Sequence, residues 1–329
     1  MSEWGGVNVL VTGGEGFIGS HLTEALVAAG ANVRVLSYYT SFGRAGWLEQ
    51  SDVRASVEVM PGDVRDAGRV REAVDGRDVV FHLAALIGIP YSYVAPESYV
   101  QTNVQGSFNV ADACRRAGVS RMVHTSTSET YGTALRVPID EDHPMQPQSP
   151  YSASKIGGDM MVLSLHHAFE LPVAVARPFN TYGPRQSTRA VIPTILSQLL
   201  GGATEVRLGS LTPTRDFNYA TDTAAGMMAI AQCDACVGSV TNIGSGAEIS
   251  VGDLAQLLIE AVGADAKVVL DETRMRPSGS EVDRLLADNT KIRTLTGWEP
   301  QVSLREGLAR TADWIRDHLA DLETGNYSV

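Results

Sequence analysis

A glycine-rich segment joins an apolar run to a helical pattern near the start of the chain, and this combination strongly limits the possible folds. The run 7–11 is continuous and apolar, as expected for a strand buried on both faces of a parallel sheet. Residues 12–19 read Thr-Gly-Gly-Glu-Gly-Phe-Ile-Gly, and the helical pattern after them stops at Gly30. Glycines let the backbone turn tightly and approach a pyrophosphate, whose charge lies at the helix N-terminus. The segment therefore predicts a dinucleotide site, with cofactor contacts at Gly13, Gly16, Phe17, Ile18 and Gly19.

Further apolar runs of strand length follow, separated by helical patterns, at 33–36, 57–60, 78–83, 122–125 and 173–176. This βα alternation predicts an α/β fold, a Rossmann-type doubly wound parallel sheet. After residue 180 the rhythm breaks, because helical stretches at 191–200 and 251–262 alternate with short strands at 205–208 and 267–270. We therefore expect a dinucleotide-binding domain made of 1–180 and about 215–243. A smaller C-terminal α/β substrate-binding lobe takes about 181–214 and 244–329.

Ligands of such a sheet lie outside the carboxyl ends of its strands, so the residues at those ends are candidate cofactor contacts. The second strand ends at Ser37, where an Asp or Glu that meets the adenosine ribose is usual for NAD. This departure leaves NADP open. Arg44 could meet a 2′-phosphate, but it is not at the strand end, so we favour NAD. Asp63, followed by Val64, is a candidate acceptor for the adenine amine or, alternatively, a helix N-cap.

The fourth strand closes with Leu83 and two small residues, Ala84 and Ala85, against which a flat cofactor can lie.

A candidate catalytic set follows the next strand. Thr127, Ser128 and Glu129 stand just after the run 122–125, and Tyr151 precedes Lys155 by four residues on an expected helix that Ser149 and Pro150 can start. This spacing places the phenol and the ammonium on one helix face. The ammonium can lower the phenol pKa from roughly 10 towards a value useful for proton transfer. Such a spacing is frequent on helices, and the glycine loop with the βα pattern is what makes it a candidate hydride-transfer site.

Composition excludes several other classes of function. The formal net charge of −12 argues against a nucleic-acid binder, which needs clustered Lys and Arg. The N-terminus has no basic region of a signal peptide, and no apolar run approaches the ~18 residues of a membrane span, so we expect a cytoplasmic protein. The pair Cys233 and Cys236 has no second pair, and the histidines lack ligand partners at useful spacing. We therefore expect no metal site.

Three segments together resemble the extended short-chain dehydrogenase/reductase family of nucleotide-sugar epimerases and dehydratases. They are the glycine loop at 12–19, Tyr-x-x-x-Lys at 151–155 and Arg-Pro-Phe-Asn-x-Tyr-Gly-Pro at 177–184, with further similarity at 215–217 and 297–300. The resemblance covers nearly the whole chain. It implies a tightly held nicotinamide cofactor and a UDP-, GDP- or dTDP-linked sugar in the cleft between the lobes. It also implies a homodimer, paired through the helices at 99–117 and 151–169.

The resemblance assigns roles residue by residue. Thr127, Tyr151 and Lys155 match the catalytic set, and Pro178 matches a cofactor contact. Arg215 and Arg276 match cations that meet the diphosphate; the residues alone also allow a surface ion pair for the first and a loop cation for the second. The other implied substrate contacts are Asn180 and Ile87 at the sugar and a nucleobase wall of Val191, Ile192, Val206 and Leu208.

The reaction type depends on the two residues after the catalytic Thr. GDP-mannose 4,6-dehydratases carry Ser-Glu there, as in Ser128-Glu129, while glucose-type dehydratases carry Asp-Glu. UDP-glucuronate decarboxylases also carry Thr-Ser-Glu, but their stretch before the catalytic Tyr differs from residues 148–150. In overall pattern, including 38–42 and 276–282, the chain most resembles N-acetylglucosamine-nucleotide 4,6-dehydratases of legionaminic-type pathways.

These features favour an NDP-hexose 4,6-dehydratase in which Glu129 takes the C5 proton. The alternatives are a UDP-sugar 4-epimerase, a UDP-glucuronate decarboxylase and, more remotely, an NAD-binding regulator without catalysis.

Overall fold

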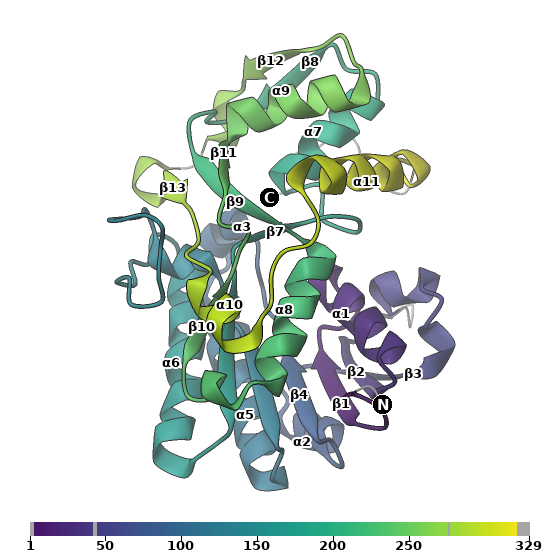
Figure 1. The fold of residues 1–329 in the computed structure, drawn as a ribbon, viewed down its shortest axis with the longest axis vertical. Coiled ribbons are helices and arrows are strands. Elements are labelled where there is room, and N and C mark those ends of the chain that lie inside the picture. Colours follow the sequence, from purple (N-terminus) through teal and green to yellow (C-terminus); the bar gives the residue numbers. More distant parts are fainter. Residues whose placement is uncertain (1–2, 42–44, 276, 321–329) are drawn as a thin grey trace.

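A seven-stranded sheet forms the centre of the larger part of the molecule (Figure 1). The computed structural model describes residues 3–41, 45–275 and 277–320. All neighbouring strands of this sheet are parallel, and their order is β3-β2-β1-β4-β5-β6-β10. The strands are β1 (Asn8–Thr12), β2 (Asn32–Tyr38), β3 (Val57–Gly62), β4 (Val79–His82), β5 (Arg121–Thr125), β6 (Val173–Pro178) and β10 (Val240–Ile243). The order reverses between β1 and β4, which confirms the predicted doubly wound fold and places a ligand crevice at that point.

Helices cover both faces of the sheet, and side chains alternate between the two resulting cores. Val9 and Val11 of β1 are buried towards α1 (Phe17–Ala28) and α8 (Ala220–Gln232). Leu10, between them, is buried on the other face, under α2 (Ala67–Val74), α5 (Gly106–Ala117) and α6 (Pro150–Phe169). This alternation follows from the two-residue period of a strand, and it explains why the centre of β1, Val9 to Val11, is apolar at every position.

Helix starts follow local capping chemistry. Ser149 caps α6, because its hydroxyl accepts a hydrogen bond from the Ser152 N–H over 3.1 Å and Pro150 takes the first turn. Asp66, not Asp63, caps α2, so the alternative reading of Asp63 as a helix cap is wrong. The expected helix at 99–117 is continuous but contains a π-helical turn, Val100–Gln105, between α4 (Pro96–Tyr99) and α5. The short helix α3 (Ile89–Val94) precedes it.

The smaller part lies above the carboxyl ends of the large sheet (Figure 1). Its helices are α7 (Val191–Leu200), α9 (Val251–Val262) and α11 (Leu304–Asp317). Strands β8 (Glu205–Leu208) and β12 (Lys267–Leu270) pair in parallel. A second small sheet is centred on β9 (Thr214–Tyr219), with β7 (Asn180–Tyr182), β11 (Glu248–Ser250) and β13 (Arg284–Leu285). The predicted bounds of α7, α9, β8 and β12 are confirmed.

The chain returns to the larger part after β13. The helix α10 (Thr290–Thr296) packs against α8 and β10, and its Ile292 is buried in the same core as Trp298. The indole N–H of Trp298 donates to the main-chain oxygen of Asp222 over 3.0 Å. We propose that the smaller lobe comprises about 181–214 and the chain from 244 onward, apart from this returning segment.

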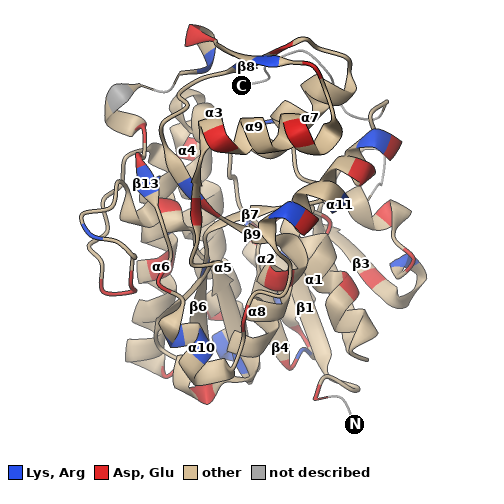
Figure 2. Ribbon diagram, turned by 45° about the horizontal axis from the view of Figure 1, so that its top comes forward, with Lys and Arg blue, Asp and Glu red and all other residues tan. Residues whose placement is uncertain are grey.

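Charge and chain character add two observations. Lys and Arg are scattered over both parts and interspersed with Asp and Glu (Figure 2). In the described part of the chain, every helix is too short or too polar to cross a bilayer.

Candidate active site

The glycine loop brings the ends of β1 and β4 into contact. Gly13 has φ +71°, and a Cβ atom there would lie 2.9 Å from the Cα and N atoms of Ala84. A Cβ atom at Gly19 would lie 2.1 Å from the Gly13 carbonyl oxygen. Neither position therefore accepts a side chain. Gly16 caps α1 without a side-chain hydrogen bond, and the first turn of α1 contains no acidic residue. The main-chain N–H groups of this turn can therefore bind a pyrophosphate.

The other predicted cofactor contacts surround this loop. Phe17 and Ile18 are half-buried in the first turn of α1. Leu83 and Ala84 follow β4 and donate to the main-chain oxygen and the hydroxyl of Thr12, over 3.1 and 3.2 Å. The residues Ser37 and Val64 are buried, Ala85 is half-buried and Pro178 is buried at the end of β6.

Asp63 is occupied by a neighbour rather than open to an adenine. Its carboxylate forms an ion pair with Arg65, whose Nη2 lies 2.5 Å from Oδ2. The hydrogen bonds from Arg65, and to a smaller degree its charge, hold the pKa of Asp63 below its usual range, although partial burial opposes them. The adenine contact at Asp63 stays a prediction.

Tyr151 and Lys155 lie on one face of α6, and both are buried. The Lys155 Nζ donates to the main-chain oxygen of Thr125 over 2.6 Å. The Thr127 hydroxyl hydrogen-bonds the Tyr151 phenol. Thus the structure brings the three expected catalytic residues together at the end of β5.

The pKa of Tyr151 departs from the sequence expectation. Burial is the largest influence and raises the phenol pKa, and the negative charge of Glu129 raises it further, against the hydrogen bond from Thr127. Burial also lowers the pKa of Lys155 to about 8, although the charge of Asp159 opposes this. The expected lowering of the phenol pKa is therefore wrong for the protein alone, because desolvation disfavours the phenolate.

A buried cluster of charged side chains lies between α6 and the sheet. Asp159, one turn after Lys155, accepts hydrogen bonds from Arg177 over 2.8 Å and from the Ser126 hydroxyl over 2.5 Å, and Nε2 of His124 lies 3.2 Å from its other oxygen. Burial alone would raise the pKa of Asp159. The close imidazole of His124 and the charges of Arg177 and Lys155 outweigh it and lower the pKa to about 2. The cluster fixes the register of α6 against β5 and β6.

Ser128 and Glu129 begin a 3-10 turn, Ser128–Tyr131, directly after Thr127. The Thr127 hydroxyl accepts the Glu129 N–H over 3.3 Å. Ser128 is buried, whereas Glu129 is half-buried and close enough to Tyr151 for its charge to affect the phenol. The site thus holds a carboxylate beside its phenol.

Among the expected substrate contacts, Asn180 carries the clearest sign of a missing partner. Its Oδ1 is buried and accepts no hydrogen bond within the described residues. The side chain of Ile87 is 66% exposed on the loop after β4. Arg215 is buried in β9, with Nη2 3.3 Å from a carboxylate oxygen of Glu281. Ile87 and Asn180 follow the carboxyl ends of β4 and β6, and Arg215 lies in β9, which pairs with the strand β7 that Asn180 begins.

The predicted nucleobase wall is largely core in this structure. The side chains of Ile192, Val206 and Leu208 are buried in the core of the smaller lobe, and Val191 is half-buried. Arg276 and Arg44 lie outside the described residues.

Arg189 is a candidate site residue that the sequence analysis did not single out. Its Nη1 lies 3.8 Å from the position that a Cβ atom on Gly88 would take, and its charge acts on Tyr99 to lower a phenol pKa that burial raises. The ring of Tyr99 stands edge-on to that of Tyr151, with 6.2 Å between centroids. A cation therefore borders the apolar loop 86–89. No local pattern marks it, because Arg189 reaches this loop from the segment after β7.

Comparison with known proteins identifies the family. The sequence model of the GDP-mannose 4,6 dehydratase family matches residues 10–311. The chain belongs to this family. Nucleotide-sugar dehydratases and epimerases both occur among its relatives, and the chain is an enzyme of this NAD-dependent group.

Individual relatives of this family member include both activities. A UDP-glucose 4-epimerase of Mycolicibacterium smegmatis is 35% identical over 317 residues, covering 94% of this chain and 99% of the relative. A dTDP-glucose 4,6-dehydratase of Streptomyces griseus is 36% identical over 318 residues, covering 94% of each. The solved structure of the dTDP-glucose 4,6-dehydratase DesIV from Streptomyces venezuelae, with NAD bound, has a TM-score of 0.87. It is 33% identical, and the match covers 96% of this chain and 99% of that one.

Proposed function

We propose that this family member is an NDP-hexose 4,6-dehydratase that uses NAD. The observation that carries the proposal is the carboxylate of Glu129 beside the phenol of Tyr151, since dehydration needs a base at C5 in addition to the acid–base group at C4. A 4-epimerase needs only the second of these groups.

The residues present fit a nicotinamide dinucleotide. The contact of Gly13 with Ala84 and the close approach at Gly19 leave a surface of backbone, and the N-terminus of α1 opens onto it. Gly13, Gly16, Ala84, Tyr151 and Lys155 would hold the group. When bound, NAD supplies the acceptor and later the donor of the hydride that leaves C4 of the sugar and enters C6.

Tyr151 handles the proton of the C4 hydroxyl. Because burial raises its pKa, the phenol gives up its proton only when positive charge stands near it. Lys155, with a pKa of about 8, is mostly charged at neutral pH and supplies part of that charge. The Thr127 hydroxyl, which hydrogen-bonds the phenol, orients the substrate oxygen on the same side. Together these residues accept the C4 proton as the carbon becomes a ketone.

Glu129 then performs the elimination. The C4 ketone acidifies the proton on C5, which the Glu129 carboxylate removes, and the C5–C6 double bond forms as the C6 hydroxyl leaves. Glu129 returns that proton to the leaving hydroxyl, so that one water is lost. Ser128, next to it in the same 3-10 turn, takes the place of the Asp of other dehydratases and assists through its hydroxyl. Addition of the hydride at C6 and of a proton at C5, equivalent to the one that Tyr151 accepted from the C4 hydroxyl, then gives a 4-keto-6-deoxy sugar.

A uronate-processing enzyme is the second candidate, because of Arg189. Such an enzyme must bind a carboxylate at C6, and the Arg189 guanidinium borders the loop 86–89, beside which we expect C6 to lie. This scaffold would then catalyse C4 epimerisation or decarboxylation after the same C4 oxidation.

The decisive experiment offers the purified protein a panel of nucleotide sugars. UDP-, GDP- and dTDP-linked glucose, N-acetylglucosamine, mannose and glucuronate are incubated separately, and the products are analysed by chromatography and mass. Loss of one water supports dehydration. An isomer of unchanged mass would show epimerisation, and loss of carbon dioxide would show decarboxylation; either would overturn the proposal. If NAD binds but none of these sugars is converted, the proposal fails for these substrates, and the alternative of a non-catalytic NAD-binding regulator gains support.

We also propose a homodimer paired through the helices at 99–117 and 151–169. Val100 of the π-helical turn and Met160 and Phe169 of α6 are exposed by 55%, 43% and 56%. Apolar side chains on two neighbouring helices are typical of a covered face. Sedimentation of the purified protein at the mass of a monomer would contradict this proposal.

A further inference from the structure

A carboxylate stands at the end of β2, although β2 itself does not supply one. The Oε1 atom of Glu15, in the glycine loop, accepts the N–H of Tyr38 over 2.8 Å. The hydroxyl of Ser37 also hydrogen-bonds this carboxylate. Ser37 occupies the position where NAD-binding folds usually carry the acid that meets the adenosine ribose. A carboxylate therefore lies close to this position, but it belongs to Glu15, 22 positions earlier in the chain.

The second oxygen of Glu15 lacks a donor. Its Oε2 is buried and accepts no hydrogen bond from the described residues. A buried acceptor without a partner costs free energy, and an ordered ligand with hydroxyl donors would relieve that cost. The adenosine ribose carries such hydroxyls at C2′ and C3′.

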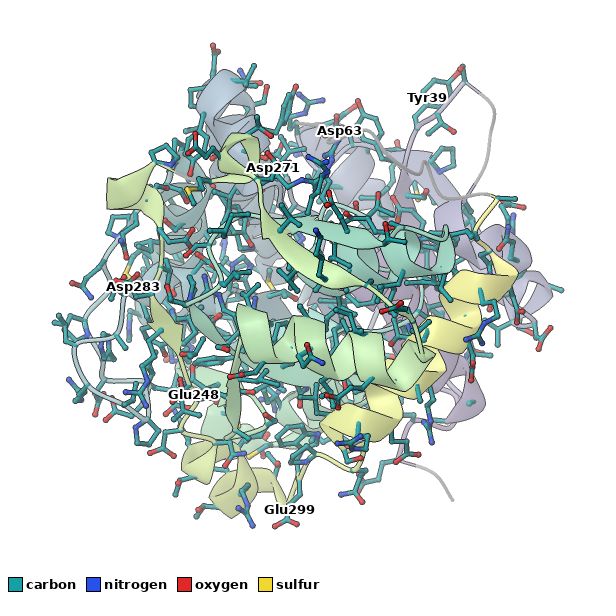
Figure 3. All side chains as sticks on the ribbon, turned by 90° about the horizontal axis from the view of Figure 1, so that it is seen from above. Tyr39, Asp63, Glu248, Asp271, Asp283 and Glu299 are labelled. Carbon is teal, nitrogen blue, oxygen red and sulfur yellow. The ribbon has the colours of Figure 1, made fainter. Side chains whose placement is uncertain are left out.

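The carboxylate also lines a hollow that can admit a ligand. This hollow has a volume of about 550 Å³ and lies between Glu15, Gly16 and the segment 46–50. It therefore adjoins the N-terminus of α1, which is the expected pyrophosphate position. Tyr39, just after β2, is 66% exposed and points away from the body of the protein, on the same side as Asp63 (Figure 3). The end of β2 is thus open to solvent.

We propose that Glu15 accepts a hydrogen bond from the 2′-hydroxyl of the adenosine ribose and makes the protein prefer NAD to NADP. A carboxylate at this position repels a 2′-phosphate and offers it no donor. The cations that the structure describes at this edge are paired with other carboxylates. Arg65 binds Asp63, and Arg54 lies 3.6 Å from Glu49. The inference rests on the proposed nicotinamide cofactor and names the residue that selects its form.

Direct binding measurements test this role without relying on turnover. The full chain, freed of nucleotide, is titrated with NAD, NADP and 2′-deoxy-NAD by calorimetry, as wild type and as Glu15→Gln. For the wild type we expect NAD to bind at least about tenfold more tightly than 2′-deoxy-NAD, as a hydrogen bond to a charged group implies. In Glu15→Gln that difference should shrink to less than about threefold, and the preference for NAD over NADP should fall about tenfold or more.

Glu49→Gln is the matched control. Glu49 lines the same hollow, but its carboxylate accepts the Ala45 N–H over 2.8 Å and pairs with Arg54. This variant should keep the wild-type ratio between NAD and 2′-deoxy-NAD, and thermal unfolding should show that both variants are folded.

Four outcomes decide between the alternatives. A loss of the 2′-hydroxyl effect in Glu15→Gln alone supports the proposal. Equal weakening of all three ligands in Glu15→Gln would mean that Glu15 only holds the end of β2, and it would overturn the proposal. An equal loss of the 2′-hydroxyl effect in Glu49→Gln would overturn it as well. If the wild type bound neither NAD nor NADP, the cofactor itself would be wrong, and this inference would fail with it.

Discussion

The Nζ atom of Lys155 lies 2.6 Å from the main-chain oxygen of Thr125 and donates a hydrogen bond to it. This bond ties α6 to the last residue of β5, two residues before Thr127. One ammonium group therefore sets how the phenol-bearing helix stands against the strand that delivers the Thr127 hydroxyl. The protonation state of Lys155 matters for position as well as for charge.

We expect activity to fall as the pH rises through about 8, because Lys155 then loses its proton. Burial lowers its pKa to about 8 from 10.5, so the unfolded chain holds this proton more tightly than the folded one. The buried ammonium thus reduces stability at neutral pH, and this penalty disappears between about pH 8 and about pH 10. A profile of kcat against pH, with Lys291→Met as control, tests the first effect. A flat profile up to about pH 9 would contradict it.

Replacement of Tyr151 by Phe should reduce turnover by about 10²- to 10⁴-fold, the usual contribution of an acid–base group. The ring contact with Tyr99 is kept, so the variant should remain folded. Product formation under saturating substrate measures the effect. Tyr91→Phe, which changes a phenol that is 38% exposed, is the control and should behave as wild type. Wild-type turnover of the Tyr151 variant would remove this residue from the mechanism.

The Glu129→Gln variant should oxidise C4 but fail to eliminate water. Gln keeps the size of the side chain but cannot take the C5 proton, so elimination should slow by at least about 10²-fold. Reduced nicotinamide should accumulate, which its absorbance detects in a stopped-flow experiment. Glu141→Gln is a suitable control, because that carboxylate accepts the Asn242 N–H over 2.8 Å and has no proposed role in the reaction. Elimination at the normal rate in Glu129→Gln would rule out its role as base.

The Asn180→Ala variant should bind substrate less well without losing stability. Its Oδ1 is buried with no partner in the described protein, so its loss removes no internal hydrogen bond. We expect KM to rise about tenfold, as for one buried hydrogen bond. Asn242, in contrast, makes internal hydrogen bonds with its side chain. Its Oδ1 accepts a hydrogen bond from the Tyr131 hydroxyl over 2.8 Å, and its Nδ2 donates one to the main-chain oxygen of Ile139. Asn242→Ala should cost about 1–3 kcal/mol in urea unfolding. An unchanged KM in Asn180→Ala would contradict the substrate contact.

Asp159→Asn should destabilise the fold by about 3–5 kcal/mol, because it leaves the buried Arg177 without its counter-charge. The folded pKa of Asp159, about 2, lies below its ordinary 3.8. Its contribution to stability is therefore present above about pH 4 and is lost as the pH falls towards 2. Urea unfolding between these pH values measures both effects. Asp234→Asn, at the ion pair with Arg121 where the Asp side chain is 97% exposed, should cost under about 1 kcal/mol.

Local chemistry made much of the fold predictable. The bounds of α7 and α9 could be read from the sequence, because α9 is capped by Ser250 and ends at Gly263 in the left-handed region, and Gly201 follows α7. The start of α6 could likewise be predicted from Ser149, its N-cap residue. Each of these signals acts between residues a few positions apart, so the sequence alone contains the necessary information.

Features that depend on distant parts of the chain were not predictable in this way. The cation of Arg189 approaches Gly88 only after the segment following β7 has folded back over the sheet. Glu15, in the loop after β1, contacts Ser37 near the end of the neighbouring strand β2, and no sequence pattern in the glycine loop indicates that contact. The pKa of Tyr151 is raised rather than lowered, because the effect of burial is larger than that of the hydrogen bond from the Thr127 hydroxyl. The spacing of residues in the sequence does not reveal the degree of burial.

The return of α10 and Trp298 to the larger sheet determines how new enzymes can be made from this one. Because the buried Ile292 and Trp298 complete the core beside α8, cutting the chain before α10 would strip that face. A chimera that takes the smaller part from a relative must therefore graft it as an insertion with several junctions. A simple exchange of C-terminal halves would also replace the segment that completes the core of the seven-stranded part.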